Sequence, residues 1–183
     1  EDPALPGFVA ANFLQRDHAA GYQGTRAAEV INHVYTPSAA ISVWVDSVYH
    51  RFPLLDRESQ ALGYGEATVG VLSAAVMDIG IGPPVKGQPS VFPPDGAKDV
   101  PAAFIGHEVP DPAPTGTQYP VGYPVTLVMG SASSFSVQSS RLLGSDGKEI
   151  PGFALLPGQQ VDQGEWSFMA QDPLRPGSSA KPG

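Results

Sequence analysis

The sequence contains no cysteine among its 183 residues, which excludes disulfide bonds, thiolate zinc sites and cysteine nucleophiles. It also has no run of 18 or more hydrophobic residues, so we expect no membrane-spanning helix. The first residues, Glu1-Asp2-Pro3, resemble no signal peptide and include no initiating methionine. We therefore expect the chain to be a processed or trimmed form of a longer protein.

Charged residues are scarce, at 15% of the chain, and acidic residues outnumber basic ones by 18 to 10, for a net charge of −8. Nucleic acids and anionic membranes bind clustered lysine and arginine, so neither is an expected partner. The sequence also lacks the phosphate-binding glycine loops, the H-E-x-x-H zinc motif and the G-x-S-x-G nucleophile motif. The sequence therefore does not indicate any of the enzyme classes that are recognised by these motifs.

Glycine and proline are abundant instead, with 21 and 20 residues. Such a chain favours turns and short strands over long helices, which excludes a helical bundle.

The composition changes near residue 82, where a proline-rich stretch begins. We predict one unit over 1–82, a linker over 83–95 and a second unit over 96–183. A linker with this many prolines is expected to be extended and to couple the units loosely.

The clearest local signal is a helix over 37–50. Thr36 can cap its first turn, and Pro37 suits the first helical position because no N–H is needed there. Pro53 is expected to end the helix near His50. The apolar positions follow helical spacing and predict a buried stripe formed by Ile41, Trp44, Val45 and Val48. A second helix is predicted over 9–20.

Short apolar segments separated by turn residues predict strands in both units. In the first unit they cover 62–68 and 71–79, joined by a turn at Gly70. In the second unit they cover 122–129, 134–143, 149–156 and 165–171. Strands at this spacing indicate an antiparallel β-sandwich for the second unit.

Two groups of polar residues are candidates for catalysis or ligand binding. Asp46 and His50 lie four residues apart, which on one helix places a carboxylate beside an imidazole, as in a general base or a metal ligand. The alternative is an ordinary helix end. His107, Glu108 and Asp111 lie in a proline-rich loop, where binding residues often occur, although a solvated loop is the simpler interpretation.

The stretch from Thr36 to Ala67 resembles the CAP family, also called SCP-like, of cysteine-rich secretory, antigen 5 and pathogenesis-related proteins. The matching elements are Trp44, Ser47, His50-Arg51, Leu54-Leu55-Asp56, Leu62-Gly63-Tyr64-Gly65, Gly21-Tyr22-Gln23-Gly24 and Ala28-Glu29-Val30-Ile31. The resemblance covers about residues 5–82 and corresponds to the C-terminal part of the domain.

This resemblance implies an α-β-α sandwich with a cleft of histidines and acidic residues. On its motifs, Glu29 and His50, with Asp46 beside His50, are the candidate catalytic residues. Glu29, His50, Arg51 and Tyr22 are the candidate ligand-binding residues. The family's first histidine would precede Glu1. We therefore expect no metal and no other cofactor, with weak divalent-metal binding as the alternative.

The second unit resembles bacterial Ig-like domains. Residues 93–101 are similar to the opening P-x-D-G-x-x-x-V-P of those domains, and residues 173–177 are similar to the segment before their last strand. No last strand is expected in SSAKPG, so one sheet edge would be open for self-association.

The predicted fold class is α+β, a partial CAP-like α-β-α unit followed by an Ig-like antiparallel β-sandwich. The expected function is that of a secreted bacterial protein of the cell envelope or extracellular space. It would bind a small molecule or a cell-wall glycan and use the Ig-like unit as a spacer or adhesion module. The alternative is an extracellular hydrolase acting on polysaccharide or peptidoglycan through Glu29 and His50, so whether the protein is an enzyme stays open.

Overall fold

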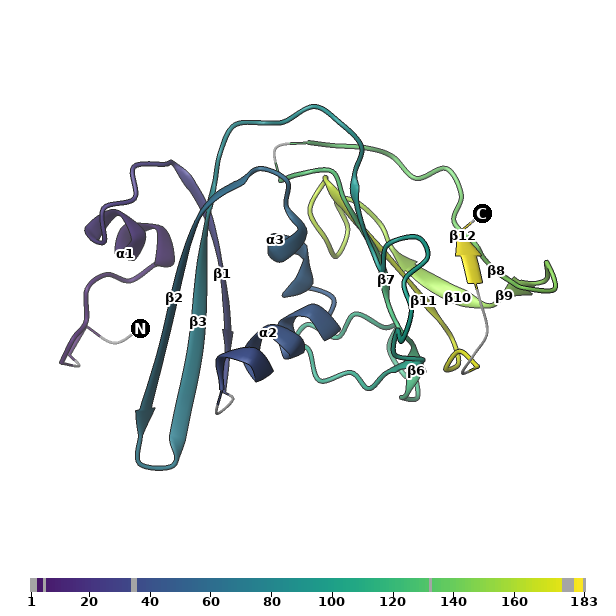
Figure 1. The fold of residues 1–183 in the computed structure, drawn as a ribbon, viewed down its shortest axis with the longest axis horizontal. Helices are drawn as coiled ribbons and strands as arrows, with labels where there is room; N and C mark the ends of the chain where they lie inside the picture. The colour runs from purple at the N-terminus through teal and green to yellow at the C-terminus, as the bar shows by residue number, and fades with distance from the viewer. Residues whose placement is uncertain (1–2, 5, 34–35, 132, 176–179, 183) are drawn as a thin grey trace.

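The computed structural model describes residues 3–4, 6–33, 36–131, 133–175 and 180–182. The fold is α+β, with few helices and several antiparallel sheets. Figure 1 shows these elements in successive layers, from α1 at one side to the last short strands at the other. The chain order is therefore also, broadly, the order of the layers.

The first sheet has three antiparallel strands, β1 (Arg26–Asn32), β2 (Ser59–Val69) and β3 (Leu72–Ile81), in the order β1-β3-β2. Helix α2 (Pro37–Asp46) covers one face, and α1 (Phe13–Ala19) lies on the other (Figure 1). The predicted strands over 62–68 and 71–79 are confirmed as β2 and β3. The helix predicted over 9–20 is present but shorter.

Helix α2 begins as predicted, because the Thr36 hydroxyl accepts the Ala39 N–H and Pro37 occupies the first position. Its predicted end is wrong. The helix stops at Asp46, since Ser47 is extended (φ −95°, ψ 173°), and a separate helix α3 (Arg51–Leu55) follows. Pro53 lies in the first turn of α3, where a missing N–H breaks no helical hydrogen bond.

Trp44 is fully buried between α2 and the first sheet, as its position in the apolar stripe predicts. Its neighbours in this first core are Val30, Ala40, Leu54, Ala75, Met77, Ile79 and Ile81. The stripe itself is different from the prediction, because Ile41 is 43% exposed and Val48 packs in another core. The break at Ser47 explains the position of Val48, since the extended residue turns Val48 away from the α2 axis.

The second unit contains a four-stranded antiparallel sheet, a three-stranded one and the two-stranded pair β5-β6. The four-stranded sheet has the order β10-β11-β7-β4, and the three-stranded sheet has the order β12-β8-β9. The strands are β4 (Ser90–Phe92), β5 (Ala103–Phe104), β6 (Val121–Gly122), β7 (Val125–Val128), β8 (Leu142–Gly144), β9 (Glu149–Ile150), β10 (Gly152–Leu155), β11 (Glu165–Ala170) and β12 (Ala180–Pro182).

These strands match the predictions unevenly. Strands β7, β10 and β11 lie where 122–129, 149–156 and 165–171 were predicted. Most of 134–143 is not a strand, and only its last residues enter β8. The expectation of no last strand is wrong, because β12 pairs with β8. Pro176 and Gly177 of the second resemblance lie outside the described residues.

A second core crosses the predicted boundary between the two units. Val48 and Phe52, from the α2–α3 segment, pack in one cluster with Val128, Leu155 and Met169 of the four-stranded sheet. The expected loose coupling is therefore wrong: α3 is packed between two sheets. Strand β4, at residues 90–92, also places part of the predicted linker at the edge of the four-stranded sheet.

The four-stranded sheet is buried on both faces. Met169 of β11 faces α3, whereas its neighbours Phe168 and Ala170 face the three-stranded sheet in a third core with Leu142. Within the described part of the chain, no helix has the length and hydrophobicity needed to cross a bilayer.

Candidate functional site

Glu29 lies on β1, on the face of the first sheet that α1 covers. It pairs with the Arg16 guanidinium of α1 and stands opposite Asp78 of β3. Partial burial, helped by the nearby Asp17 and Glu29 carboxylates, raises the pKa of Asp78 to about 6. Glu29 is therefore part of a helix-to-sheet contact.

His50 lies before α3 and has a different partner. Its Nδ1 is 3.2 Å from Oε1 of Glu108, a buried carboxylate in the loop after β5. The two Glu108 oxygens also accept the backbone N–H groups of Val48, at 2.7 Å, and Tyr49, at 2.9 Å. The structure thus brings His50 together with Glu108 and does not pair it with Glu29.

Asp46 does not orient His50. Its Oδ1 accepts a hydrogen bond from the Tyr123 hydroxyl at 2.7 Å. The expected Asp46–His50 pair fails because the helix ends at Asp46, so a spacing of four residues no longer means one helical face. The sequence-predicted catalytic residues Glu29, His50 and Asp46 therefore have three separate partners.

The two other predicted ligand-binding residues are structural. Arg51 is fully buried, donates to the Val45 and Pro124 carbonyls, and lies over the Phe92 and Tyr123 rings. A guanidinium in this position is not available to a ligand in solution.

Tyr22 donates its hydroxyl to the carbonyls of Arg26, at 2.8 Å, and Ile81, at 3.2 Å. Its ring lies over Gly80, where an added Cβ would be 2.5 Å from the ring. Tyr22 therefore joins the ends of β1 and β3.

The residues that the CAP resemblance offers for a metal do not fit one. Glu29 is already paired with Arg16, and His50 with Glu108. Among the described residues, no group of three or more histidines, aspartates and glutamates is arranged to hold a metal ion.

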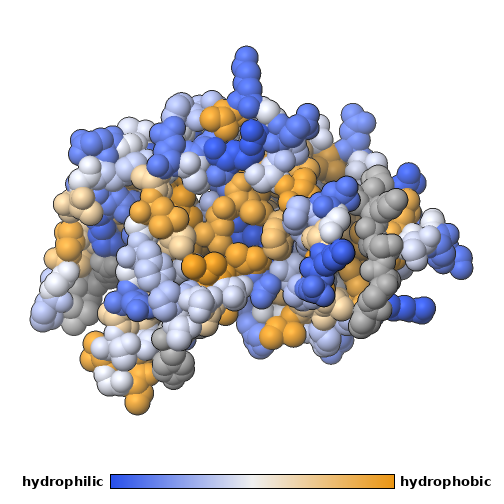
Figure 2. Space-filling view, viewed as in Figure 1, coloured by the Kyte–Doolittle hydropathy of each residue, from blue (hydrophilic) through white to orange (hydrophobic). Residues whose placement is uncertain are grey.

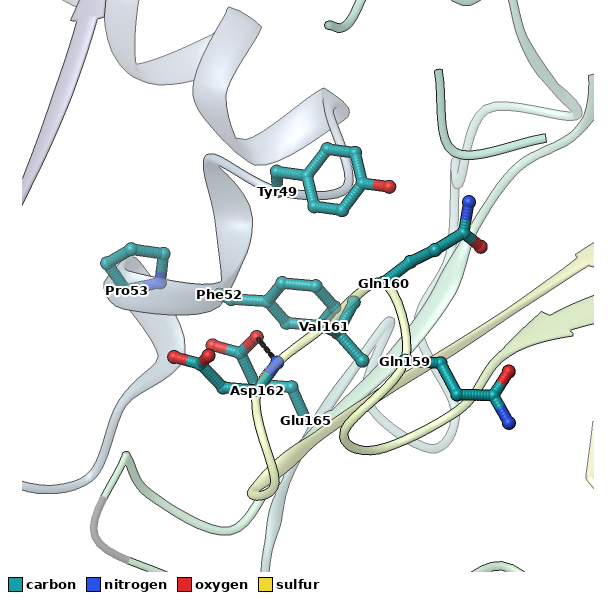
Figure 3. A pocket seen from close by; sticks show the side chains of 8 residues that line it. All are labelled: Tyr49, Phe52, Pro53, Gln159, Gln160, Val161, Asp162 and Glu165. Atoms are coloured by element: carbon teal, nitrogen blue, oxygen red, sulfur yellow. Dashed lines mark hydrogen bonds between the residues drawn. The ribbon is translucent and has the colours of Figure 1, made fainter. Parts of the chain in front are cut away.

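A polar pocket lies elsewhere, between α3 and the loop before β11. It is open to solvent, has a volume of about 370 Å³ and is lined by Tyr49, Phe52, Pro53, Gln159, Gln160, Val161, Asp162 and Glu165. Figure 3 shows the Tyr49 and Phe52 rings on the α3 side, the Asp162 and Glu165 carboxyl groups beside Phe52, and the Gln159 amide pointing away from both rings. The pocket therefore combines residues about 100 positions apart.

Two polar groups of this pocket have distinctive surroundings. The Tyr49 hydroxyl oxygen is buried and has no hydrogen-bond partner among the described residues. Burial raises the pKa of Glu165 to about 7, and the Asp162 and Asp56 carboxylates add to this, while the Asp162 N–H opposes it. Near neutral pH, Glu165 can therefore either donate or accept a hydrogen bond.

Sequence reasoning missed every residue of this pocket. Tyr49 lies near the end of the helix predicted over 37–50 and Phe52 follows that helix, but nothing local indicates that residues 159–165 lie against them. The signal that could have helped is the polar segment Gly158-Gln159-Gln160, which interrupts the apolar pattern between two strands.

Comparison with family models, with curated proteins and with solved structures gives no match for this chain.

Proposed function

We propose that this is a secreted bacterial envelope protein in which a CAP-like unit and an Ig-like sandwich together form a binding site for a glycan. Three observations support the proposal. The first sheet is covered by helices on both faces, as the CAP resemblance implies. The antiparallel sheets of the second unit pack face to face, as an Ig-like sandwich would. The predicted catalytic residues have separate partners, which favours binding over hydrolysis.

The pocket chemistry suits a sugar. A sugar ring has C–H faces that pack on aromatic rings, here Tyr49 and Phe52. Its hydroxyls donate and accept hydrogen bonds, which the amides of Gln159 and Gln160 and the carboxyl of Glu165 can match.

The single observation that carries the proposal is the mixed lining of one open pocket, where the Tyr49 and Phe52 rings from the α3 side meet polar side chains of the loop before β11 (Figure 3). The Tyr49 hydroxyl oxygen is closed to solvent, so Tyr49 offers its ring to a ligand. An aromatic surface beside amide and carboxyl groups is the combination that a sugar ring requires.

The test is calorimetric titration with a soluble N-acetylglucosamine oligosaccharide and with peptidoglycan fragments. Tyr49→Ala removes a ring from the pocket wall, so we expect at least about tenfold weaker binding, whereas Tyr49→Phe keeps the ring and should bind as wild type does. Gln160→Ala is expected to weaken binding as well, whereas the matched control Gln138→Ala, outside the pocket, should have no effect. Absence of saturable binding to every glycan, or equal binding by wild type and Tyr49→Ala, would contradict the proposal.

A further inference from the structure

The β2–β3 hairpin exposes more large apolar side chains than any other described element. Leu62 is 65% exposed, Val69 78%, Val71 84% and Leu72 74%. Figure 1 shows the hairpin extending beyond the end of α2, and Figure 2 shows hydrophobic side chains at its tip. Isolated proteins rarely leave such a surface uncovered.

Strand β2 is also an open edge. Among the described strands it pairs only with β3, and all eleven of its residues are exposed. Natural edge strands are usually protected by proline, lysine, bulges or a covering element. Between Ser59 and Val69 there is no proline and no basic residue, the only charge is Glu66, and the register is regular after one irregularity at its start.

We propose that two copies of this chain associate through their β2 strands, antiparallel and centred on Gly65, to form one continuous six-stranded sheet. This proposal is independent of the glycan pocket, because no residue of β2 lines that cavity. The partner is a second copy because the edge is complementary to itself in one register.

In that register, Tyr64 faces Glu66 of the partner subunit, and the reverse pair forms across the two-fold axis. The Tyr64 hydroxyl donates to the Glu66 carboxylate of its own chain at 3.1 Å, and in the dimer it can donate to Glu66 of the partner subunit instead. Centring the pairing on Glu66 would place like charges directly opposite, which is unfavourable. Centring the pairing on Tyr64 would place the apolar Leu62 opposite the charged Glu66 of the partner subunit, which is a poorer match than Tyr64 opposite Glu66.

The register also leaves room for the partner. Gly63 and Gly65 lie on one face of β2, and an added Cβ at either would meet no atom within 4 Å. On the other face, Leu62 and Tyr64 stand beside Ile79 and Met77 of β3, so pairing would extend the apolar surface under α2.

The absence of cysteine allows a sharp test of the register. Residues directly opposite in an antiparallel pair have Cα atoms about 5 Å apart, within disulfide range. Gly65→Cys alone should therefore give an oxidised dimer on a non-reducing gel. Gly63→Cys alone should not, because its two copies would be about 13 Å apart. A mixture of Gly63→Cys and Ala67→Cys should cross-link.

Light scattering tests the association without a cysteine. At concentrations up to about 1 mM we expect wild type to reach twice the 19.1 kDa mass of one chain. Gly65→Asp, which places two carboxylates on the axis, should weaken the dimer at least tenfold, whereas Gly65→Ser should not. Circular dichroism checks that each variant is folded. A monomeric wild type, or cross-linking of Gly63→Cys alone as efficient as that of Gly65→Cys, would overturn the proposal.

Discussion

At the scale of single residues, Glu108 connects the two halves of the chain. Its carboxylate accepts two backbone N–H groups just after α2 and also contacts His50. The sequence points to the polar cluster containing Glu108, but favours a solvated loop. The side chain is instead buried, because its partners come from a segment almost 60 residues earlier. No local pattern encodes that contact.

Replacement of Glu108 should therefore be costly. Glu108→Ala leaves the N–H groups of Val48 and Tyr49 without acceptors in a buried region, for an expected loss of about 2–4 kcal/mol. Urea denaturation measures this loss. Glu149→Ala, at an exposed glutamate of β9, is the control and should change stability by less than about 0.5 kcal/mol. Equal losses in the two variants would show that Glu108 has no such role.

Asp78 should make stability depend on pH. Its pKa is about 6 in the folded protein against an ordinary value of 3.8, so ionisation is harder in the folded state. Stability from this group is complete below about pH 4 and is lost as pH rises through about 6. Because Asp78 is only partly buried, we discount the effect for solvent screening to about 1 kcal/mol.

Asp78→Asn removes this dependence. The variant should gain stability relative to wild type as pH rises from 4 to 7, measured by denaturant unfolding at each pH. Comparing the two proteins cancels the contribution of Glu165, whose raised pKa acts in the same direction. A stability difference that is constant over this range would contradict the assignment.

At the scale of elements, the sequence is most informative where the determinants are local. The Thr36 cap, Pro37 and the Gly70 turn correctly predict where α2 begins and where β2 and β3 join. The end of α2 is not predictable, because the extended Ser47 is followed by N–H groups that Glu108 satisfies from a distant loop. The candidate site was misplaced for the same reason.

Trp44 tests how α2 is attached to the first sheet. Its side chain is fully buried against Met77 and Ile79 of β3. Trp44→Ala should cost about 3–5 kcal/mol of folding free energy in denaturant titration. Ile41→Ala, on the exposed side of the same helix, is the matched control and should cost far less. A loss below about 1 kcal/mol for Trp44→Ala would mean that α2 is not docked in this way.

At the scale of the whole molecule, the shared core makes one cooperative unit from what the composition divides into two. Each half contains one tryptophan, Trp44 in the first and Trp166 in the second. Trp44→Phe and Trp166→Phe leave a single fluorescent reporter in each half. Once each midpoint is corrected for the stability that its own substitution costs, the urea transitions of the two variants should have the same midpoint and slope. Two separate transitions would mean that the halves unfold independently.

The central claim is that α3 and the loop before β11 together bind a glycan. The most direct measurement is a titration of ¹⁵N-labelled protein with a soluble N-acetylglucosamine oligosaccharide, followed by amide chemical shifts. The account predicts saturable shifts at Tyr49, Gln160 and Asp162 together, from both sides of the pocket, with the β2–β3 hairpin unaffected. No saturable shift, or shifts confined to residues outside this pocket, would contradict it.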